Sequence, residues 1–154
     1  MDRRIFLTIV GASALASSPA VACGFEICRS EAEWRARLTQ NEYLVLRDAK
    51  TERPFTSPLT DEMRPGLYHC RGCDLAVYDA TAKYESRTGW PSFHESLRNA
   101  VGTQLDRRYV LLVRTAVYCR RCGSHLGHIF DDDPAPTGKR HCLNGLSLVF
   151  VPAQ

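Results

Sequence analysis

The residues best suited to chemistry in this 154-residue chain are its seven cysteines. Six of them lie in pairs only a few residues apart: Cys23 with Cys28, Cys70 with Cys73, and Cys119 with Cys122. The seventh, Cys142, stands alone in the stretch KRHCLNG at 139–145. Because a cysteine thiolate is both a nucleophile and a soft metal ligand, this arrangement predicts metal binding, redox chemistry or both.

The two C-x-x-C motifs predict a structural zinc site. Each motif brings two thiolates onto one tight turn, and two such turns supply the four soft ligands of a closed tetrahedral site. The 45 residues between Cys73 and Cys119 exceed the spacing of a zinc finger, so we expect two separate hairpins that the fold brings together. The predicted ligands of one zinc ion are Cys70, Cys73, Cys119 and Cys122.

Three other interpretations of the motifs stay open at this level. A disulfide within each motif would close a very small loop and stabilise little, and a thioredoxin-type motif would need a βαβ setting. A metal could also be held by two thiolates and two imidazoles, from Cys119, Cys122, His125 and His128. That arrangement would leave Cys70 and Cys73 without a role, so we favour the four-thiolate site.

Cys142 is the cysteine that the zinc site does not need, which makes it a candidate nucleophile. Strand alternation would place Arg140, Cys142 and Asn144 on one face and His141 on the other. A nearby guanidinium lowers the pKa of a thiol and increases its reactivity. The alternative is a small buried cysteine with a packing role only.

Two further motifs accompany this cysteine. The stretch GSHLGHIFDD at 123–132 places His125 and His128 three residues apart, and GWPSF at 89–93 contains a Trp-Pro turn. Each motif taken singly is compatible with core packing or a structural turn. Together with four zinc thiolates and a spare cysteine, they form a recognisable set.

The chain resembles the B-type methionine sulfoxide reductases, which reduce the R-epimer of methionine sulfoxide. The resemblance runs in order through SEAEWRARLT (30–39), TERPF, the two C-x-x-C motifs, GWPSF, HLGHIFDD, PTGKRHCLN and the final SLVFVP. It covers almost all of residues 23–154. It implies two antiparallel sheets with short N-terminal helices, the zinc site described above, and Cys142 as the nucleophile.

The resemblance also implies roles for the polar and aromatic residues around Cys142. Trp90 and Phe93 match substrate-binding positions, and the matching polar positions of the active site are His125, His128, Arg140 and Asn144. In the implied reaction, the Cys142 thiolate attacks the sulfoxide sulfur while His128 protonates the oxygen. Methionine leaves and Cys142 becomes a sulfenic acid, which a thioredoxin-like donor then reduces.

One departure from the family concerns how the sulfenic acid is reduced. Many members carry a resolving cysteine just before the Gly-Trp-Pro turn, where this chain has Thr88. The remaining thiols are Cys28 and Cys23, so one hypothesis is that Cys28 resolves Cys142 by folding over the site. The alternative is direct attack on the sulfenic acid by an external reductant.

The elements that must position these residues are predicted to be helices near the N-terminus and strands in the rest of the chain. Two S/T-x-x-E patterns, at 30–33 and 39–42, are capping boxes and predict short helices at 31–38 and 40–47. The stretch 51–66 is rich in proline and threonine and predicts an irregular connection. Alternating or β-prone patterns at 75–77, 109–118 and 146–150 then predict strands, so we expect an α+β fold with mainly antiparallel sheets.

The first 22 residues have the pattern of an export signal. Arg3 and Arg4 precede a short apolar run, and the segment ends in Ala-Val-Ala, which is typical of a cleaved twin-arginine signal. Residues 23–154 then form a single catalytic domain in the periplasm, and folding before export would protect the zinc thiolates. Cys23 would be the first mature residue, so a lipid anchor on it is the alternative.

The composition narrows the possible partners. The formal net charge is +3, with no basic stripe of the kind that binds nucleic acid, and we expect a monomer. The expected macromolecular partners are oxidised proteins and a thioredoxin-like donor, with a membrane only if Cys23 is lipidated. Two rival functions are a zinc-ribbon-like interaction module, which leaves Cys142 and Trp90 unexplained, and a peroxide-reducing thiol enzyme.

Overall fold

The structure is a computed structural model that describes residues 23–109, 112–132 and 136–154. The predicted export signal at 1–22 therefore lies outside the described residues. Among the residues that are described, no helix has the length and apolar character needed to cross a membrane.

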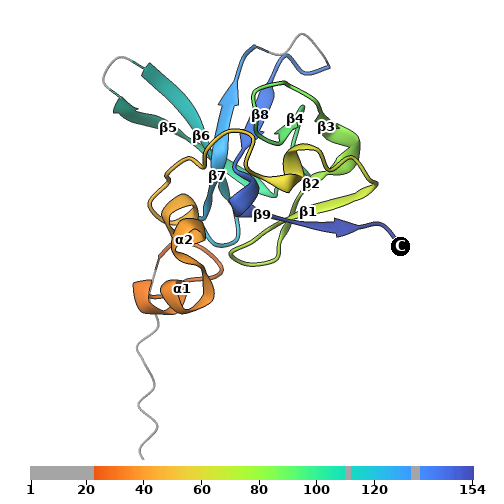
Figure 1. Cartoon of the computed structure of the whole chain (residues 1–154). Helices are drawn as coiled ribbons and strands as arrows, with labels where there is room; N and C mark the ends of the chain where they lie inside the picture. Colours follow the sequence, from red (N-terminus) through yellow and green to blue (C-terminus); the bar gives the residue numbers. More distant parts are fainter. Residues whose placement is uncertain (1–22, 110–111, 133–135) are drawn as a thin grey trace, which may run out of the picture.

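Two short helices follow the N-terminal leader, as the capping boxes predict. Helix α1 spans Glu31–Arg37 and α2 spans Gln40–Leu46. Both capping boxes form, because each cap hydroxyl accepts from the third helical N–H while the glutamate accepts from the cap N–H. The helices lie together at one end of the molecule, and α2 packs against β7 (His125–Phe130) (Figure 1).

The smaller sheet has three antiparallel strands in the order β2-β1-β9. Strand β1 spans Gly66–Cys70, β2 spans Ala76–Asp79, and β9 spans Leu148–Pro152. The strand predicted to include Leu146 begins only at Leu148, because Gly145–Ser147 forms a 3-10 turn (η3) instead. Two further 3-10 turns, η1 (Pro58–Thr60) and η2 (Ala80–Ala82), lie in the connections.

The larger sheet has six strands in the order β3-β4-β8-β7-β6-β5, and all its neighbouring pairs are antiparallel. Figure 1 shows the long β5–β6 hairpin at one side of this sheet and β8 near its middle. The remaining bounds are β3 Lys83–Tyr84, β4 Ser92–Phe93, β5 Val101–Tyr109, β6 Leu112–Cys119 and β8 Arg140–Leu143. The expected fold class is confirmed.

The core joins the two sheets through aromatic side chains. Tyr68 on β1, Tyr78 on β2 and Phe93 on β4 are all fully buried. The Phe93 ring lies 4.9 Å from the Tyr68 ring and 4.7 Å from the Tyr78 ring, between centroids. Burial of these large side chains fixes the position of β4 and of its neighbour in the sheet, β8, which carries Cys142.

Candidate active site and metal centre

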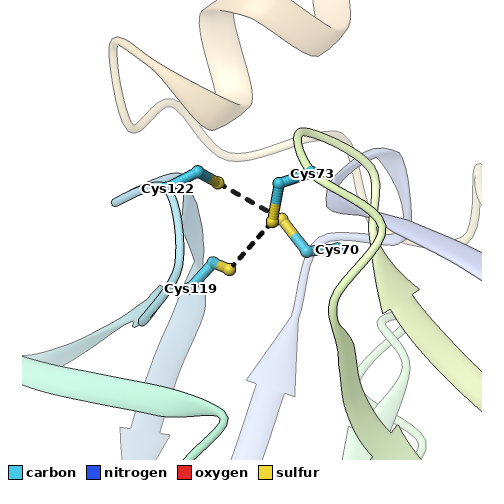
Figure 2. Close-up of side chains that lie close together, drawn as sticks. All are labelled: Cys70, Cys73, Cys119 and Cys122. Atoms are coloured by element: carbon cyan, nitrogen blue, oxygen red, sulfur yellow. Dashed lines mark hydrogen bonds between the residues drawn. The ribbon is translucent and has the colours of Figure 1, made fainter. Parts of the chain in front are cut away.

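The two C-x-x-C motifs lie on the turns of separate hairpins. Cys70 and Cys73 flank the β1–β2 turn, where the Asp74 N–H donates to the Cys70 carbonyl at 2.8 Å. Cys119 and Cys122 flank the β6–β7 turn, where the Gly123 N–H donates to the Cys119 carbonyl at 2.8 Å. Figure 2 shows that the four side chains point toward one another from these two turns.

The four sulfur atoms have the spacing of a tetrahedral zinc site. All lie within 4.8 Å of one another, with 3.5 Å between Cys73 and Cys119 and 3.8 Å between Cys70 and Cys122. Four sulfurs about 2.3 Å from a shared tetrahedral centre would be about 3.8 Å apart. Within the described ranges, these cysteines are the only cluster of three or more metal-ligand side chains. The alternative metal site, made of Cys119, Cys122, His125 and His128, is therefore not formed.

The electrostatics of the cluster also suit a divalent cation. The pKa of the Cys70 thiol is raised, first by hydrogen bonds to neighbouring sulfurs and then by burial. The pKa of Cys122 is lowered, because the neighbouring thiols donate to its sulfur. Four thiolates this close repel one another unless a soft cation lies between them. The cysteines of both motifs are free thiols, so the disulfide interpretation does not hold.

The leader cysteines form a disulfide with each other. The Cα atoms of Cys23 and Cys28 lie 5.6 Å apart and the sulfurs are bonded. This corrects the expectation that Cys28 or Cys23 is a free resolving thiol for Cys142. A disulfided pair has no thiol with which to attack a sulfenic acid.

The leader also lies beside the metal centre and not over Cys142. The Ile27 N–H donates to the Arg121 carbonyl at 2.9 Å, next to Cys122. Cys142 pairs with His128 on β7, which pairs with Ala116 on β6, five residues before Arg121. Strand β6 ends at Cys119, three residues beyond Ala116, which is about 10 Å along the sheet at about 3.3 Å per residue. Strand β8 also lies two strands away from β6, which adds about 10 Å across the sheet at about 4.8 Å per strand. The tertiary fold therefore separates the two groups that the resolving hypothesis needed to bring together.

Cys142 occupies the middle of the larger sheet. In register it pairs with Ser92 on β4 and with His128 on β7. Its sulfur lies 3.9 Å from the Thr88 hydroxyl, at the position where the family resemblance leads one to expect a resolving cysteine. The predicted alternation of β8 is confirmed, since Arg140 and Cys142 share one face while His141 is buried against Tyr78.

Burial opposes ionisation of the Cys142 thiol, whereas its polar neighbours favour it. Burial raises the pKa of the Cys142 thiol, whereas the Arg140 charge and hydrogen bonds to Thr88 and Ser92 act in the lowering direction. Burial is the largest effect, so the pKa lies above its ordinary value, which corrects the expected lowering. Arg140 is itself held by Asp132, through bonds of 2.9 and 2.6 Å.

A small pocket of about 110 Å³ opens over Cys142. It brings together four predicted site residues: Trp90, His128, Cys142 and Asn144. Thr51, Arg114, Gly127, Phe130 and Leu143 complete its lining. Only glycine fits at position 127, because a Cβ there would lie 2.1 Å from the Cys142 carbonyl oxygen. Gly127, Phe130 and Leu143 belong to the motifs that contain His128 and Cys142, whereas no sequence pattern pointed to Thr51 or Arg114.

Backbone hydrogen bonds fix the pocket walls. The Trp90 indole N–H donates to the Glu52 carbonyl at 3.2 Å, and the Glu52 N–H donates to the Asn144 side-chain oxygen at 3.0 Å. The Asn144 amide also donates to the Leu126 carbonyl at 3.1 Å. Glu52 was not predicted, although it connects two of the predicted site residues.

Asp106 and Arg114 form a second unpredicted group behind His128. The Asp106 carboxylate lies 2.9 Å from the Nε2 atom of His128 and 2.9 Å from the Arg114 guanidinium. Asp106 and Arg114 pair directly across β5 and β6. A buried carboxylate in contact with an imidazole fixes the orientation of the ring. The only sequence signal is a charged residue in each of two strands, which is not specific.

Arg140 and the leader cysteines do not line the pocket, and neither do two other predicted site residues, His125 and Phe93. His125 is buried on β7 with its ring centroid 5.2 Å from that of His128. Phe93, expected to bind substrate, is instead fully buried between Tyr68 and Tyr78. Ser92, the other residue of β4, faces Cys142 instead, because successive side chains of a strand point to opposite faces.

The fold and the two cysteine sites define an α+β protein with a four-cysteine cluster that could hold a metal ion and a separate pocket that contains a single cysteine. Residues 38–152 match the SelR domain family, so the chain belongs to that family. The match contains both C-x-x-C motifs and Cys142, and it extends from the end of α1 to β9.

Curated relatives from plants and bacteria agree with this assignment. The chain is 44% identical over 125 residues to a protein of Oryza sativa named "Peptide methionine sulfoxide reductase B1, chloroplastic", covering 81% of the chain and 58% of that protein. It is 47% identical over 122 residues to "Peptide methionine sulfoxide reductase MsrB" of Cellvibrio japonicus, covering 79% and 86%. The MsrB protein of Leifsonia xyli is 45% identical over 129 residues, covering 83% and 93%. The chain thus spans under two thirds of the plant relative.

Proposed function

We propose that this protein reduces the R-epimer of methionine sulfoxide to methionine, using Cys142 as the nucleophile. The observation that carries the proposal is the pocket of about 110 Å³ in which Cys142, His128 and Trp90 meet. The names of the family relatives support the same reaction. The pocket has room for the end of one side chain, which suits methionine sulfoxide as the reacting group.

In the proposed reaction, the Cys142 thiolate attacks the sulfoxide sulfur while an acid protonates the oxygen. Attack forms a bond between the Cys142 sulfur and the substrate sulfur. The hydroxyl then passes from the substrate sulfur to the Cys142 sulfur as the sulfur–sulfur bond and the original sulfur–oxygen bond break, which leaves Cys142 as a sulfenic acid. The substrate sulfur gains two electrons, the cysteine sulfur loses two, and methionine leaves. His128 is the proposed acid, positioned by Asp106, and Trp90 supplies an apolar wall for the methyl group.

The sulfenic acid is reduced by an external thiol. The first thiol attacks Cys142, which forms a mixed disulfide and releases water, and a second thiol displaces Cys142 and restores it. The described residues support this route because Thr88 replaces the usual cysteine and the leader cysteines are bonded to each other. A thioredoxin-like protein is the proposed donor, and oxidised proteins are the proposed substrates.

Zinc has a structural role in this proposal. Cys70, Cys73, Cys119 and Cys122 would hold one ion, which when bound joins the β1–β2 and β6–β7 turns. Strand β7, which carries His128, begins three residues after Cys122. The metal site therefore fixes the start of a strand that the active site uses.

We further propose that residues 1–22 are a cleaved twin-arginine signal and that residues 23–154 act in the periplasm. The supporting features are Arg3, Arg4 and the Ala-Val-Ala end of the segment. The Cys23–Cys28 disulfide is compatible with an oxidising compartment. Mass analysis of the protein recovered from the periplasm would test this, and a mature chain that still carried residues 1–22 would contradict it.

The reductase proposal is tested with methionine-R-sulfoxide and dithiothreitol. We expect turnover of the R-epimer but not of the S-epimer, and loss of turnover in Cys142→Ser. Cys28→Ser is the matched control, because Cys28 lies in the leader, and we expect it to retain activity. Unchanged turnover in Cys142→Ser, no turnover in any form, or a higher rate on peroxide would overturn the proposal.

A further inference from the structure

Residues 50–56 separate the Cys142 pocket from two larger cavities on the same part of the molecule. Thr51 lines both the pocket and a second cavity of about 380 Å³. Leu44 on α2 and Leu146 contribute apolar surface to this second cavity. A third cavity of about 610 Å³ shares Leu146 with it and extends to Phe150 on β9. We call these two adjoining cavities the flanking groove.

The wall of the flanking groove is tied to the active site through Glu52. Its side chain is only 8% exposed, and its carboxylate accepts from the Gly145 N–H at 2.5 Å and the Leu146 N–H at 2.9 Å. Its backbone bonds to Asn144 and Trp90 belong to the pocket itself. The groove is therefore preformed and held in fixed position relative to Cys142, which lowers the cost of ordering on binding.

The neighbouring residues of a protein substrate must lie close to this groove. A methionine side chain inserted into the pocket leaves the main chain at the pocket mouth, extending in both directions. Thr51, at that mouth, borders the flanking groove. A cavity of about 380 Å³ lies within the range of about 300–1,000 Å³ that is typical of ligand sites.

The charges that line the second cavity favour acidic segments. Its charged lining residues are Lys50, Glu52 and Arg53. Lys50 and Arg53 are exposed, whereas the Glu52 carboxylate is buried and turned toward backbone N–H groups. The accessible charge is therefore positive, and it complements aspartate or glutamate beside the reacting methionine.

We propose that the flanking groove binds the residues adjacent to methionine sulfoxide in a polypeptide substrate, and that Lys50 and Arg53 select acidic residues there. This inference rests on the proposed reductase function. It makes the flanking sequence, and not only the sulfoxide, a determinant of which oxidised methionines are repaired first.

The test compares three substrates: N-acetyl-methionine-R-sulfoxide amide and two heptapeptides with a central methionine-R-sulfoxide. One peptide has aspartates and the other has lysines beside the sulfoxide on both sides. We expect kcat/KM of the wild type to be about fivefold higher for the acidic peptide, since exposed charge pairs contribute modestly. Sodium chloride at high concentration should shrink the ratio, because salt screens exposed charges.

The variant Lys50→Glu/Arg53→Glu should abolish or reverse the ratio and leave turnover of the small amide unchanged. Arg37→Glu/Arg98→Glu is the matched control, because it makes the same change in net charge at exposed residues outside the groove. It should keep the wild-type ratio. Equal kcat/KM for the two peptides, or a ratio retained in the Lys50/Arg53 variant, would overturn the inference. Failure to reduce even the small amide would instead overturn the reductase function.

Discussion

The metal centre and the Cys142 pocket both depend on cysteine, but their surroundings differ in kind. At the metal centre each sulfur has other sulfurs within 4.8 Å. Around Cys142 the neighbours are hydroxyls, a guanidinium and an imidazole, and the leader cysteines are held elsewhere. Thiols surrounded by thiols bind metal and lose reactivity, whereas a thiol isolated among polar donors can be oxidised and reduced repeatedly.

The largest expected effect is on thermal stability, to which we expect the metal centre to contribute and Cys142 not to contribute. Cys119→Ser removes one of the four proposed zinc ligands, which come from two hairpins, so we expect zinc content to fall and the melting temperature to drop by about 10 °C or more. Cys142→Ser should keep the zinc and the wild-type melting temperature. Metal analysis and thermal unfolding measure both. A Cys119→Ser protein with full stability would show that the cluster is not structural.

The second prediction concerns the buried carboxylate behind His128. Asp106→Asn removes the charge that positions the imidazole, and we expect kcat to fall about 100-fold with little change in KM. Asp131→Asn is the control, since Asp131 is exposed and pairs with the surface residue Lys139. A kcat within threefold of wild type in a folded Asp106→Asn protein would remove Asp106 from the mechanism.

The third prediction concerns a variant with a second thiol beside Cys142. The Thr88 hydroxyl lies 3.9 Å from the Cys142 sulfur, so Thr88→Cys should form an intramolecular disulfide after one equivalent of methionine-R-sulfoxide. The wild type should show a sulfenic acid at Cys142 and no new disulfide. Peptide mapping by mass spectrometry distinguishes these outcomes. Detection of a Cys28–Cys142 disulfide in the wild type would contradict the external-thiol route.

The smallest expected effect concerns ionisation of Cys142. Burial raises its pKa and Arg140 opposes that rise, so Arg140→Met should raise the pKa further. The thiolate fraction increases as pH rises through the pKa, and the alkylation curve of Cys142 should therefore move to higher pH. At a fixed pH of 8 we expect alkylation to slow by about three- to tenfold. Lys139→Met, next along the chain and exposed, is the control, and an equal shift in both variants would contradict the role of Arg140.

Much of the local structure follows from the sequence. The capping boxes at Ser30 and Thr39 begin helices where predicted, because their hydrogen bonds involve residues three apart. The alternation of β8 places Arg140 and Cys142 on one face for the same local reason. Phe93 shows the limit, since a five-residue motif does not say which of its aromatic side chains enters the core.

The sequence by itself determined which cysteines suit which chemistry: four on two turns with metal-ligand spacing, and Cys142 apart from every other cysteine. The tertiary structure decided which side chains surround Cys142. Asp106, Arg114 and Glu52 reach the site through strand register and loop packing across long sequence separations. The same packing holds Ile27, the residue before Cys28, against Arg121 and away from Cys142. Spacing along a chain fixes contacts within a turn, but contacts between strands depend on the burial of the whole core.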